Sequence, residues 1–196
     1  MSEPEGFQAL LPVLRALDDL GVAHYVGGSL ASSAHGVPRA SIDADVVAAL
    51  EPRHAPGLIA ALGDAYYLSE ERVRDAIARR ASCNLIHLAT MIKIDLFVAQ
   101  DRPFDRRALA RHGVTALGVE DPVALPIAAA EDILLAKLEW YRRGGEVSAR
   151  QWEDVLGILR VSGDSLDGEY LRAGAVELGV EDLYQAALAA AREPRR

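Results

Sequence analysis

The sequence predicts a mixed α/β core followed by a helical C-terminal part. Three observations support this fold class. Apolar runs of strand length alternate with segments of helical periodicity up to about residue 120. Two neighbouring apolar runs are joined by only two residues, which is typical of an antiparallel hairpin. No strand pattern follows from residue 126 onward. We therefore expect residues 1–120 to form the core and residues 121–196 to pack on it as helices.

The core elements are recognised by their periodicity and their end signals. Leucines recur at helical spacing in the first segment, Gly27-Gly28 end the first strand, and Ser69 is a good helix N-cap. The expected core elements, in order, are a helix over residues 7–20, a strand over 22–26, a helix over 29–35, a strand over 42–50, helices over 52–62 and 69–80, strands over 82–88 and 91–98, a short basic helix over 104–111 and a strand over 114–119.

The C-terminal part reads as helices throughout. A long helix over residues 127–143 would be ended by Gly144-Gly145. Ser148 and Gln151 have the spacing of a capping box, which predicts a second helix ending near residue 160. Two further helices are expected over residues 166–178 and 183–191.

Composition excludes several classes of protein. The 196 residues are 51% hydrophobic and 26% charged, the balance of an ordinary globular protein rather than a disordered or fibrous one. No apolar run approaches the roughly 18 residues that span a bilayer, so no membrane partner is expected. A single cysteine and an acidic N-terminus without a signal-peptide pattern point to the cytoplasm. The net charge of −8 argues against electrostatic binding of nucleic acid by the protein surface as a whole.

The first candidate site is the turn Gly27-Gly28-Ser29 between a strand and a helix. Glycines allow a phosphate to approach the backbone closely, a helix N-terminus attracts anions, and the Ser29 hydroxyl adds a donor. The alternative is an ordinary tight turn in which Ser29 is only the N-cap. Taken alone, the turn favours this alternative.

Asp43 and Asp45 form the second candidate site. Residues two apart in a strand share a face, so Ile42, Ala44 and Val46 would face the core and the two aspartates would project together. Like charges ~4 Å apart repel by roughly 4 kcal/mol at an effective dielectric near 20. A divalent cation would reverse that penalty, and Mg²⁺ prefers carboxylates with substrate phosphates. The alternative is a solvated strand face screened by water and salt.

A third carboxylate, Asp95, lies in a later apolar run that is interrupted only by Lys93 and Asp95. Charges in such a run need partners. One interpretation is a simple Lys93–Asp95 pair at a sheet edge. The other places Asp95 beside Asp43 and Asp45 around two metal ions, with a nucleoside triphosphate held at the glycine turn.

Together these motifs resemble the nucleotidyltransferase fold of the DNA polymerase beta superfamily. The resemblance covers roughly residues 20–160 and rests on Gly27-Gly28-Ser29, Arg39, Ser41, Asp43, Asp45 and Asp95. Within the superfamily the chain looks most like minimal bacterial proteins grouped with AbiEii-type abortive-infection toxins. Their additional helical motif, a lysine followed by an arginine and an aspartate, is matched by Lys137, Arg150 and Asp154.

The resemblance implies a role for each matched residue. Asp43 and Asp45 would hold Mg²⁺ or Mn²⁺, and Asp95 would be a third ligand or the base that accepts the proton of the attacking hydroxyl. Lys137 would neutralise the triphosphate, and Asp154 would orient Lys137 or the incoming substrate. The implied nucleotide-binding residues are Gly27, Gly28, Ser29, Arg39, Ser41, Lys137 and Asp154. Two positions depart from the usual pattern, because Gln151 replaces a frequent aspartate and Ser41 replaces a threonine.

The expected activity is metal-dependent transfer of a nucleotidyl group, for example from ATP, to an acceptor hydroxyl. The resemblance to toxins makes a tRNA or a protein the first choice of acceptor, and a small molecule such as an aminoglycoside-like sugar the second. A toxin-like enzyme would also have a small antitoxin partner. The alternatives are a catalytically silent nucleotide- or partner-binding module on the same fold, and a purely structural partner protein. A serine hydrolase with Ser29 in a nucleophile elbow is disfavoured, because only one strand precedes that serine.

Two weaker features complete the sequence interpretation. The five histidines lack the spacing of metal ligands. A small basic patch on the predicted helix 104–111 and just before it is a solvated face by default and an RNA or nucleotide contact as the alternative; its members are Arg102, Arg106, Arg107 and Arg111.

Overall fold

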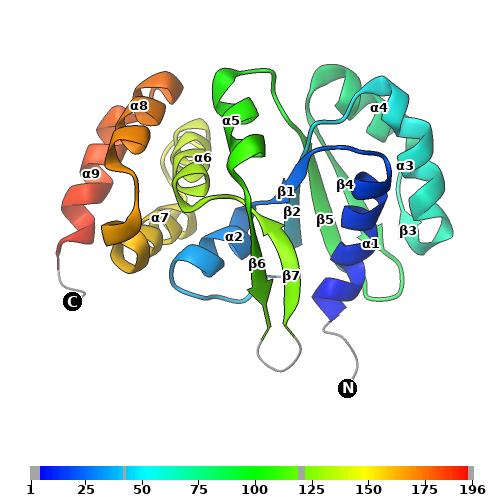
Figure 1. Cartoon of the computed structure of the whole chain (residues 1–196), viewed down its shortest axis with the longest axis horizontal. Coiled ribbons are helices and arrows are strands. Elements are labelled where there is room, and N and C mark those ends of the chain that lie inside the picture. The colour runs from blue at the N-terminus through cyan, green and yellow to red at the C-terminus, as the bar shows by residue number, and fades with distance from the viewer. Residues whose placement is uncertain (1–4, 42, 119–121, 194–196) are drawn as a thin grey trace. The chain divides into compact units, whose positions relative to one another are not determined.

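A mixed sheet is formed by strands that lie between His24 and Ile127 in the sequence (Figure 1). The computed structural model describes residues 5–41, 43–118 and 122–193. The strands of the described residues are β1 (His24–Val26), β2 (Asp43–Ala48), β3 (Tyr66–Tyr67), β4 (Ser82–His87), β5 (Lys93–Val98), β6 (Gly113–Leu117) and β7 (Val123–Ile127). They form one 7-stranded sheet of order β3-β4-β5-β2-β1-β7-β6. The β2–β5 and β1–β7 pairs are parallel and the others antiparallel, which confirms the predicted mixed α/β class.

Helices precede, interrupt and follow the strands. The α-helices of the described residues are α1 (Glu5–Asp19), α2 (Gly28–His35), α3 (Ala55–Leu62), α4 (Glu70–Arg79), α5 (Pro103–Arg111), α6 (Ala130–Arg143), α7 (Ala149–Ser162), α8 (Gly168–Leu178) and α9 (Glu181–Ala191). Short 3-10 turns lie at Pro52–His54, Gly63–Ala65 and Gly163–Ser165. In the described part of the chain, every helix is too short or too polar to cross a membrane.

Contacts divide the chain into two units. The sheet unit comprises Met1–Gly27 and Ser41–Ile127, and the helical unit comprises Gly28–Ala40 and Ala128–Arg196. The chain passes for the last time from the sheet unit to the helical unit between Ile127 and Ala128. Residues 28–40, which include α2, belong to the helical unit although they lie between two strands in sequence.

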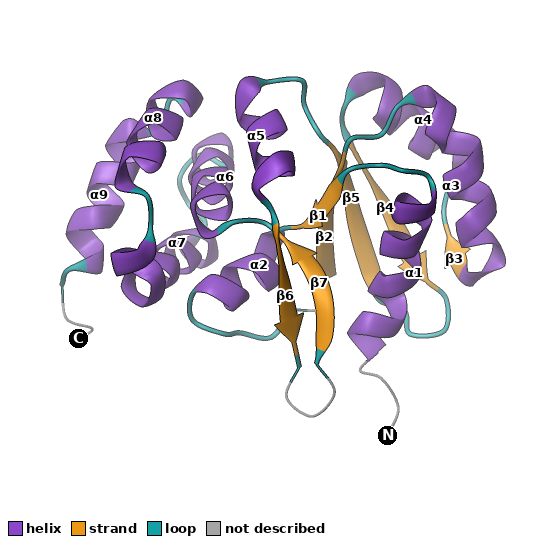
Figure 2. Cartoon of the chain, in the orientation of Figure 1, coloured by secondary structure: helices purple, strands orange, loops and turns teal. Residues whose placement is uncertain are grey.

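The core of the sheet unit lies on one face of its strands. Alternate residues of β2 and β5 are buried there, namely Ala44, Val46, Ala48, Ile94, Leu96 and Val98. Helices α1, α3 and α4 lie together on one side of the sheet (Figure 2), and α1 and α4 contact β5 directly. Tyr66 links β3 to α1, because its buried hydroxyl donates a 2.7 Å hydrogen bond to the Ala9 carbonyl. Burial of this hydroxyl raises the pKa of Tyr66 to about 12.

The helical unit is held together by α2, α6 and α7, which contact one another, with α8 against α6 and α9 against α7. Its core consists of aliphatic side chains such as Leu134, Leu138 and Ile158, all fully buried. The backbone at the end of α2 lies very close to the backbone of α7. A Cβ placed on Gly36 would lie 2.8 Å from the Ile158 nitrogen and 2.9 Å from the Gly157 carbonyl carbon.

Most predicted elements are confirmed within one to three residues at each end. The hairpin forms as expected, with Cys83 opposite Leu96 in antiparallel register. Ser69 caps α4 by accepting a hydrogen bond from the Arg72 amide, and Ser148 does the same for Gln151 at α7. The side chain of Gln151 does not complete the expected capping box. Its oxygen accepts a hydrogen bond from Lys137 instead.

The prediction that a long helix begins at residue 127 was wrong. Residues Val123–Ile127 form β7, and α6 begins only at Ala130. Pro126 concealed this strand, because proline removes a ladder donor and normally argues against a strand. It is tolerated here since β7 pairs with β1 only through Ile127. The two-residue strand β3 was also missed, while Ile42 and Val119, the expected ends of two strands, lie outside the described residues.

We predict that Gly36→Ala destabilises the protein by about 2–3 kcal/mol. The added methyl group would meet main-chain atoms of α7, which cannot rotate away as a side chain can. Urea unfolding monitored by circular dichroism measures the change.

Gly6→Ala is the matched control, because nothing lies within 4 Å of the added Cβ in the first turn of α1. Its stability should be unchanged or slightly higher, since alanine favours a helix over glycine. Equal stability of the two variants would contradict the close packing of α2 on α7.

Candidate functional site

Four charged side chains share one face of the sheet unit. In the parallel ladder between β2 and β5, Asp43 pairs with Lys93 and Asp45 pairs with Asp95. Paired residues of neighbouring strands point to the same face, and residues two apart do so as well. The carboxylates of Asp43, Asp45 and Asp95 therefore project together, opposite the buried alternate residues.

Lys93 makes ion pairs with two of these carboxylates. Its Nζ lies 2.9 Å from Asp95 Oδ2 and 3.4 Å from Asp43 Oδ2. The side chains are 36% exposed for Lys93, 45% for Asp43 and 19% for Asp95, so these ion pairs are open to water and Asp95 is the least exposed of the three. The hydrogen bond to Asp95 is the main cause that raises the pKa of Lys93, and it keeps the ammonium charged. Because β5 lies between β4 and β2, this pair is not at a sheet edge.

The donor chemistry of this face fits a hard divalent cation. Carboxylate oxygens are the ligands that Mg²⁺ takes, together with water and phosphates. In the described part of the chain no three His, Cys, Asp or Glu side chains already converge as a metal-binding group. Asp43 and Asp95 nevertheless direct one oxygen each toward a common cation, the Lys93 ammonium. The residues present can therefore serve a cation at this place.

The glycine turn changes from strand to helix within one residue. β1 ends at Val26, the Gly27 amide donates a 2.9 Å hydrogen bond to the Asp45 carbonyl, and α2 begins at Gly28. Gly28 has a φ of 55°, in the left-handed region that glycine enters without strain. Ser29 lies within the first turn of α2, and its carbonyl accepts a 3.1 Å hydrogen bond from the Ser32 hydroxyl.

A second charged cluster lies inside the helical unit. Asp154 of α7 accepts two hydrogen bonds from Arg39, at 2.8 Å from Nε and 2.9 Å from Nη2. Its Oδ2 also lies 2.8 Å from Nζ of Lys137 in α6. The side chains of Asp154 and Lys137 are each only 7% exposed, whereas that of Arg39 is 28% exposed. The Lys137 ammonium donates a further 3.3 Å hydrogen bond to Gln151.

The charge of Asp154 is fixed by its two cationic partners. Burial by itself raises the pKa of this carboxyl, but the hydrogen bonds and charges of Arg39 and Lys137 outweigh it. The net effect is a pKa below the usual range, so Asp154 stays ionised. One buried carboxylate thus holds two cations, and the cluster carries a net positive charge.

Other residues highlighted by the sequence have local partners. The Ser41 hydroxyl donates a 2.9 Å hydrogen bond to the Asp43 carbonyl, at the start of β2. In the basic patch, Arg102 pairs with Asp105 and Arg106 pairs with Asp101, so part of its charge is balanced locally.

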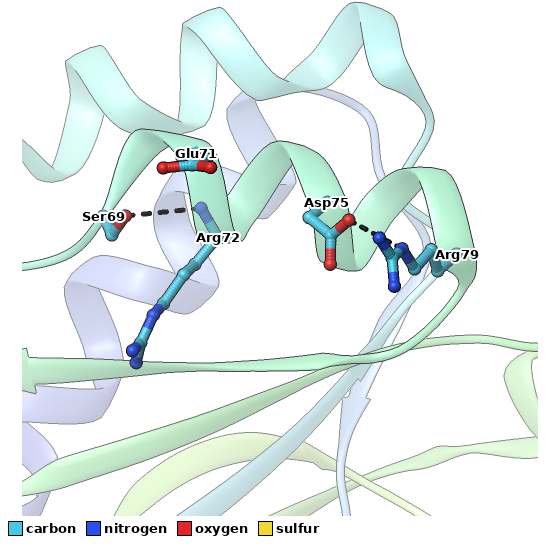
Figure 3. Close-up of a pocket in the computed structure, with 5 residues that line it drawn as sticks. All are labelled: Ser69, Glu71, Arg72, Asp75 and Arg79. Atoms are coloured by element: carbon cyan, nitrogen blue, oxygen red, sulfur yellow. Dashed lines mark hydrogen bonds and ion pairs between the residues drawn. The ribbon is translucent and has the colours of Figure 1, made fainter.

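A surface pocket of the sheet unit lies elsewhere, on α4 (Figure 3). It is lined by Ser69, Glu71, Arg72, Asp75 and Arg79, none of which the sequence singled out as a site residue. Asp75 and Arg79 form an ion pair at 2.7 Å within the helix. The pocket is therefore a polar hollow along one helix, separate in its residues from the carboxylate face.

Comparison with known proteins identifies the fold. No family model and no curated protein matches the chain. A crystal structure of an antigenic nucleotidyltransferase-like protein from Paracoccidioides brasiliensis matches with a TM-score of 0.52 at 17% identity, over 95% of this chain and 93% of that one. The chain has a nucleotidyltransferase fold. A crystal structure of ANT(2")-Ia in complex with adenylyl-2"-tobramycin matches with a TM-score of 0.51 at 13% identity, over 90% of this chain and 98% of that one.

On this nucleotidyltransferase fold, lysine usage is a signal that sequence interpretation overlooked. Of the 21 basic residues only two are lysines, Lys93 and Lys137, and the rest are arginines. Each lysine contacts an aspartate that the motifs single out. Lysine is a compact charge on a flexible stem, whereas arginine is a rigid fork, so the two are not interchangeable at such places.

We predict that Asp154→Asn lowers the free energy of unfolding by about 3 kcal/mol at pH 7, because Arg39 and Lys137 lose their counter-charge in a buried place. A carboxyl with a lowered folded pKa stabilises the fold above its unfolded pKa of about 3.9 and loses this effect as the pH falls through the folded value. The difference from the wild type should therefore narrow below about pH 4. Urea unfolding across pH 3–7 measures it.

Asp182→Asn is the matched control. Asp182 also accepts hydrogen bonds from an arginine, Arg142, but its side chain is 71% exposed. Its substitution should leave the unfolding curve at pH 7 nearly unchanged. A similar loss in both variants would show that burial of the Asp154 cluster contributes little.

Proposed function

We propose that this protein transfers a nucleotidyl group from a nucleoside triphosphate to an acceptor hydroxyl in a metal-dependent reaction, with pyrophosphate as the leaving group. The observation that carries the proposal is the carboxylate face. Asp43, Asp45 and Asp95 stand on two adjacent parallel strands of a nucleotidyltransferase fold, and two of them already share a cation. A purely structural role would not require three carboxylates on the same face of two adjacent strands, where like charges repel.

We assign metal binding to Asp43, Asp45 and Asp95, with Mg²⁺ or Mn²⁺ as the ion. When bound, such ions stabilise the charge on the attacking and leaving oxygens. Asp95 is the least exposed of the ion-paired carboxylates, and its oxygen could accept the proton of the attacking hydroxyl. Ser41 supports the face by holding the main chain at Asp43.

We assign the triphosphate to the glycine turn and the buried cations. Gly27 and Gly28 offer backbone that a phosphate can approach, and Ser29 adds a hydroxyl in the first turn of α2. Lys137 and Arg39 supply positive charge, and Asp154 orients both through its hydrogen bonds. Arg39 is the more exposed of the two cations and is therefore the better placed to reach a phosphate within the helical unit.

For the acceptor, a small-molecule hydroxyl is the first candidate. The solved structure of ANT(2")-Ia contains adenylyl-2"-tobramycin, an adenylylated small molecule. This precedent on the same fold also makes ATP the first nucleotide to test. A tRNA or protein acceptor, with a small antitoxin as partner, is the second candidate and rests on the resemblance to AbiEii-type toxins.

The deciding experiment supplies each α-labelled nucleoside triphosphate with Mg²⁺ or Mn²⁺ and, in separate reactions, aminoglycosides, total tRNA or a protein extract. We expect label to move to one acceptor class and pyrophosphate to be released only when metal is present. A protein that binds triphosphate but never consumes it would be the catalytically silent module, and the proposed activity would be wrong.

We predict that Asp45→Asn lowers the transfer rate by roughly a hundred- to a few-thousand-fold, because a lost charge worth ~3–5 kcal/mol in the transition state gives that factor. Without metal, its melting temperature should be unchanged or slightly higher, since repulsion within the carboxylate face is relieved. Transfer assays and thermal melts of the metal-free protein measure both.

Asp64→Asn is the control, because Asp64 is exposed in a 3-10 turn outside every motif. It should retain wild-type activity and stability. If Asp45→Asn keeps its activity but melts at a clearly lower temperature, Asp45 is a structural carboxylate and its assignment as a metal ligand is wrong.

A further inference from the structure

Lys93 occupies the place of a cation on the carboxylate face. Its Nζ lies within ion-pair distance of Asp95 and Asp43, one on its own strand and one on the neighbouring strand. Register fixes this arrangement, since Lys93 is the direct ladder partner of Asp43 and stands two residues before Asp95. The side chain is 36% exposed, so its ammonium can leave the carboxylates for water without crossing a packed core.

Lys93 pairs with one carboxylate oxygen of Asp43 and one of Asp95. Both aspartates are residues that we assign as metal ligands. An ammonium ion and a divalent cation cannot both occupy the space between the same oxygens. The cluster of three aspartates and Lys93 carries a formal charge of −2. After the lysine has moved aside, the three carboxylates carry −3, and one divalent cation reduces this to −1. Attraction to a doubly charged ion is stronger than to a singly charged one at equal distance.

We propose that Lys93 is a built-in counter-cation that holds Asp43 and Asp95 together when no metal is bound and that an entering metal ion displaces. The inference rests on the proposed function, because it requires metal to bind at these carboxylates. Because a metal ion has to displace Lys93, metal without nucleotide binds more weakly than it would to the same carboxylates without the lysine. A metal that arrives with a triphosphate is favoured, since phosphate oxygens supply further ligands. The freed ammonium remains nearby as a partner for negative charge.

The first test compares metal affinity in three proteins without nucleotide. Mn²⁺ alone is titrated by calorimetry into the wild type, Lys93→Met and Lys93→Arg. Methionine keeps an unbranched stem of similar length but removes the charge. We expect about three- to twentyfold tighter Mn²⁺ binding in Lys93→Met, from the loss of two competing exposed ion pairs. Lys93→Arg keeps a competing cation and should stay within about twofold of the wild type.

The second test follows Lys93 itself in the wild type and does not depend on any variant folding. Because the chain has only two lysines, protein labelled with ¹³C-lysine gives two side-chain Cε signals, and Lys93→Arg assigns them by removing one. Titration with Mg²⁺, which is diamagnetic, should shift the Lys93 signal in parallel with binding. The signal of Lys137, buried against Asp154, should stay within its linewidth and serves as the internal control.

The outcomes separate the two proposals. Tighter Mn²⁺ binding by Lys93→Met together with a metal-dependent shift of Lys93 supports displacement. If metal binds with equal affinity to all three proteins, or binds while the Lys93 signal does not move, the displacement proposal is overturned and metal-dependent transfer still stands. If none of the three binds Mn²⁺ at millimolar concentration, with or without ATP, the metal site of the proposed function fails, and the role of Lys93 fails with it.

Discussion

The parallel pairing of β2 with β5 is the constraint on which the candidate chemistry depends. This ladder sets Asp43 beside Lys93 and Asp45 beside Asp95. A shift of one residue would send the aspartates of one strand into the face where Ala44, Val46 and their neighbours are buried, which the apolar core does not permit. The hydrophobic alternation that drives folding therefore also gathers the charges, so the site is a consequence of the core.

Charge gathered in this way has to be balanced, and the protein uses a different solution in each unit. On the sheet face, Lys93 compensates an excess of carboxylates in an environment that is open to water. In the helical unit, one carboxylate, Asp154, compensates an excess of cations in a nearly closed environment. The first arrangement is open to water, which would suit the exchange of one cation for another, as proposed for Lys93. The second is rigid and suits a fixed positive potential.

Much of this could be predicted from the sequence. Alternating apolar residues predicted β2 and β5, the short connection predicted the hairpin, and the Asp43–Asp45 spacing predicted a shared face. β7 was missed because Pro126 interrupts a short apolar run. The strand tolerates this proline because β7 pairs with β1 only through Ile127. Of the two ion pairs of Lys93, only the one with Asp95 was among the interpretations of the sequence. A Lys93–Asp95 contact follows from spacing within one strand, whereas the contact to Asp43 needs the neighbouring strand.

The sequence by itself determined most of the secondary structure of both units, β3 and β7 apart, and the side of each strand on which its aspartates stand. It also determined the resemblance to a nucleotidyltransferase. These features depend on local periodicity and on short sequence motifs. Only the tertiary structure decided that β2 and β5 are neighbours in parallel register, that residues 28–40 belong with the C-terminal helices, and that Asp154 binds both Arg39 and Lys137. Each of these joins residues far apart in the chain, and such pairings are selected by the packing of the whole core rather than by any local preference of the backbone.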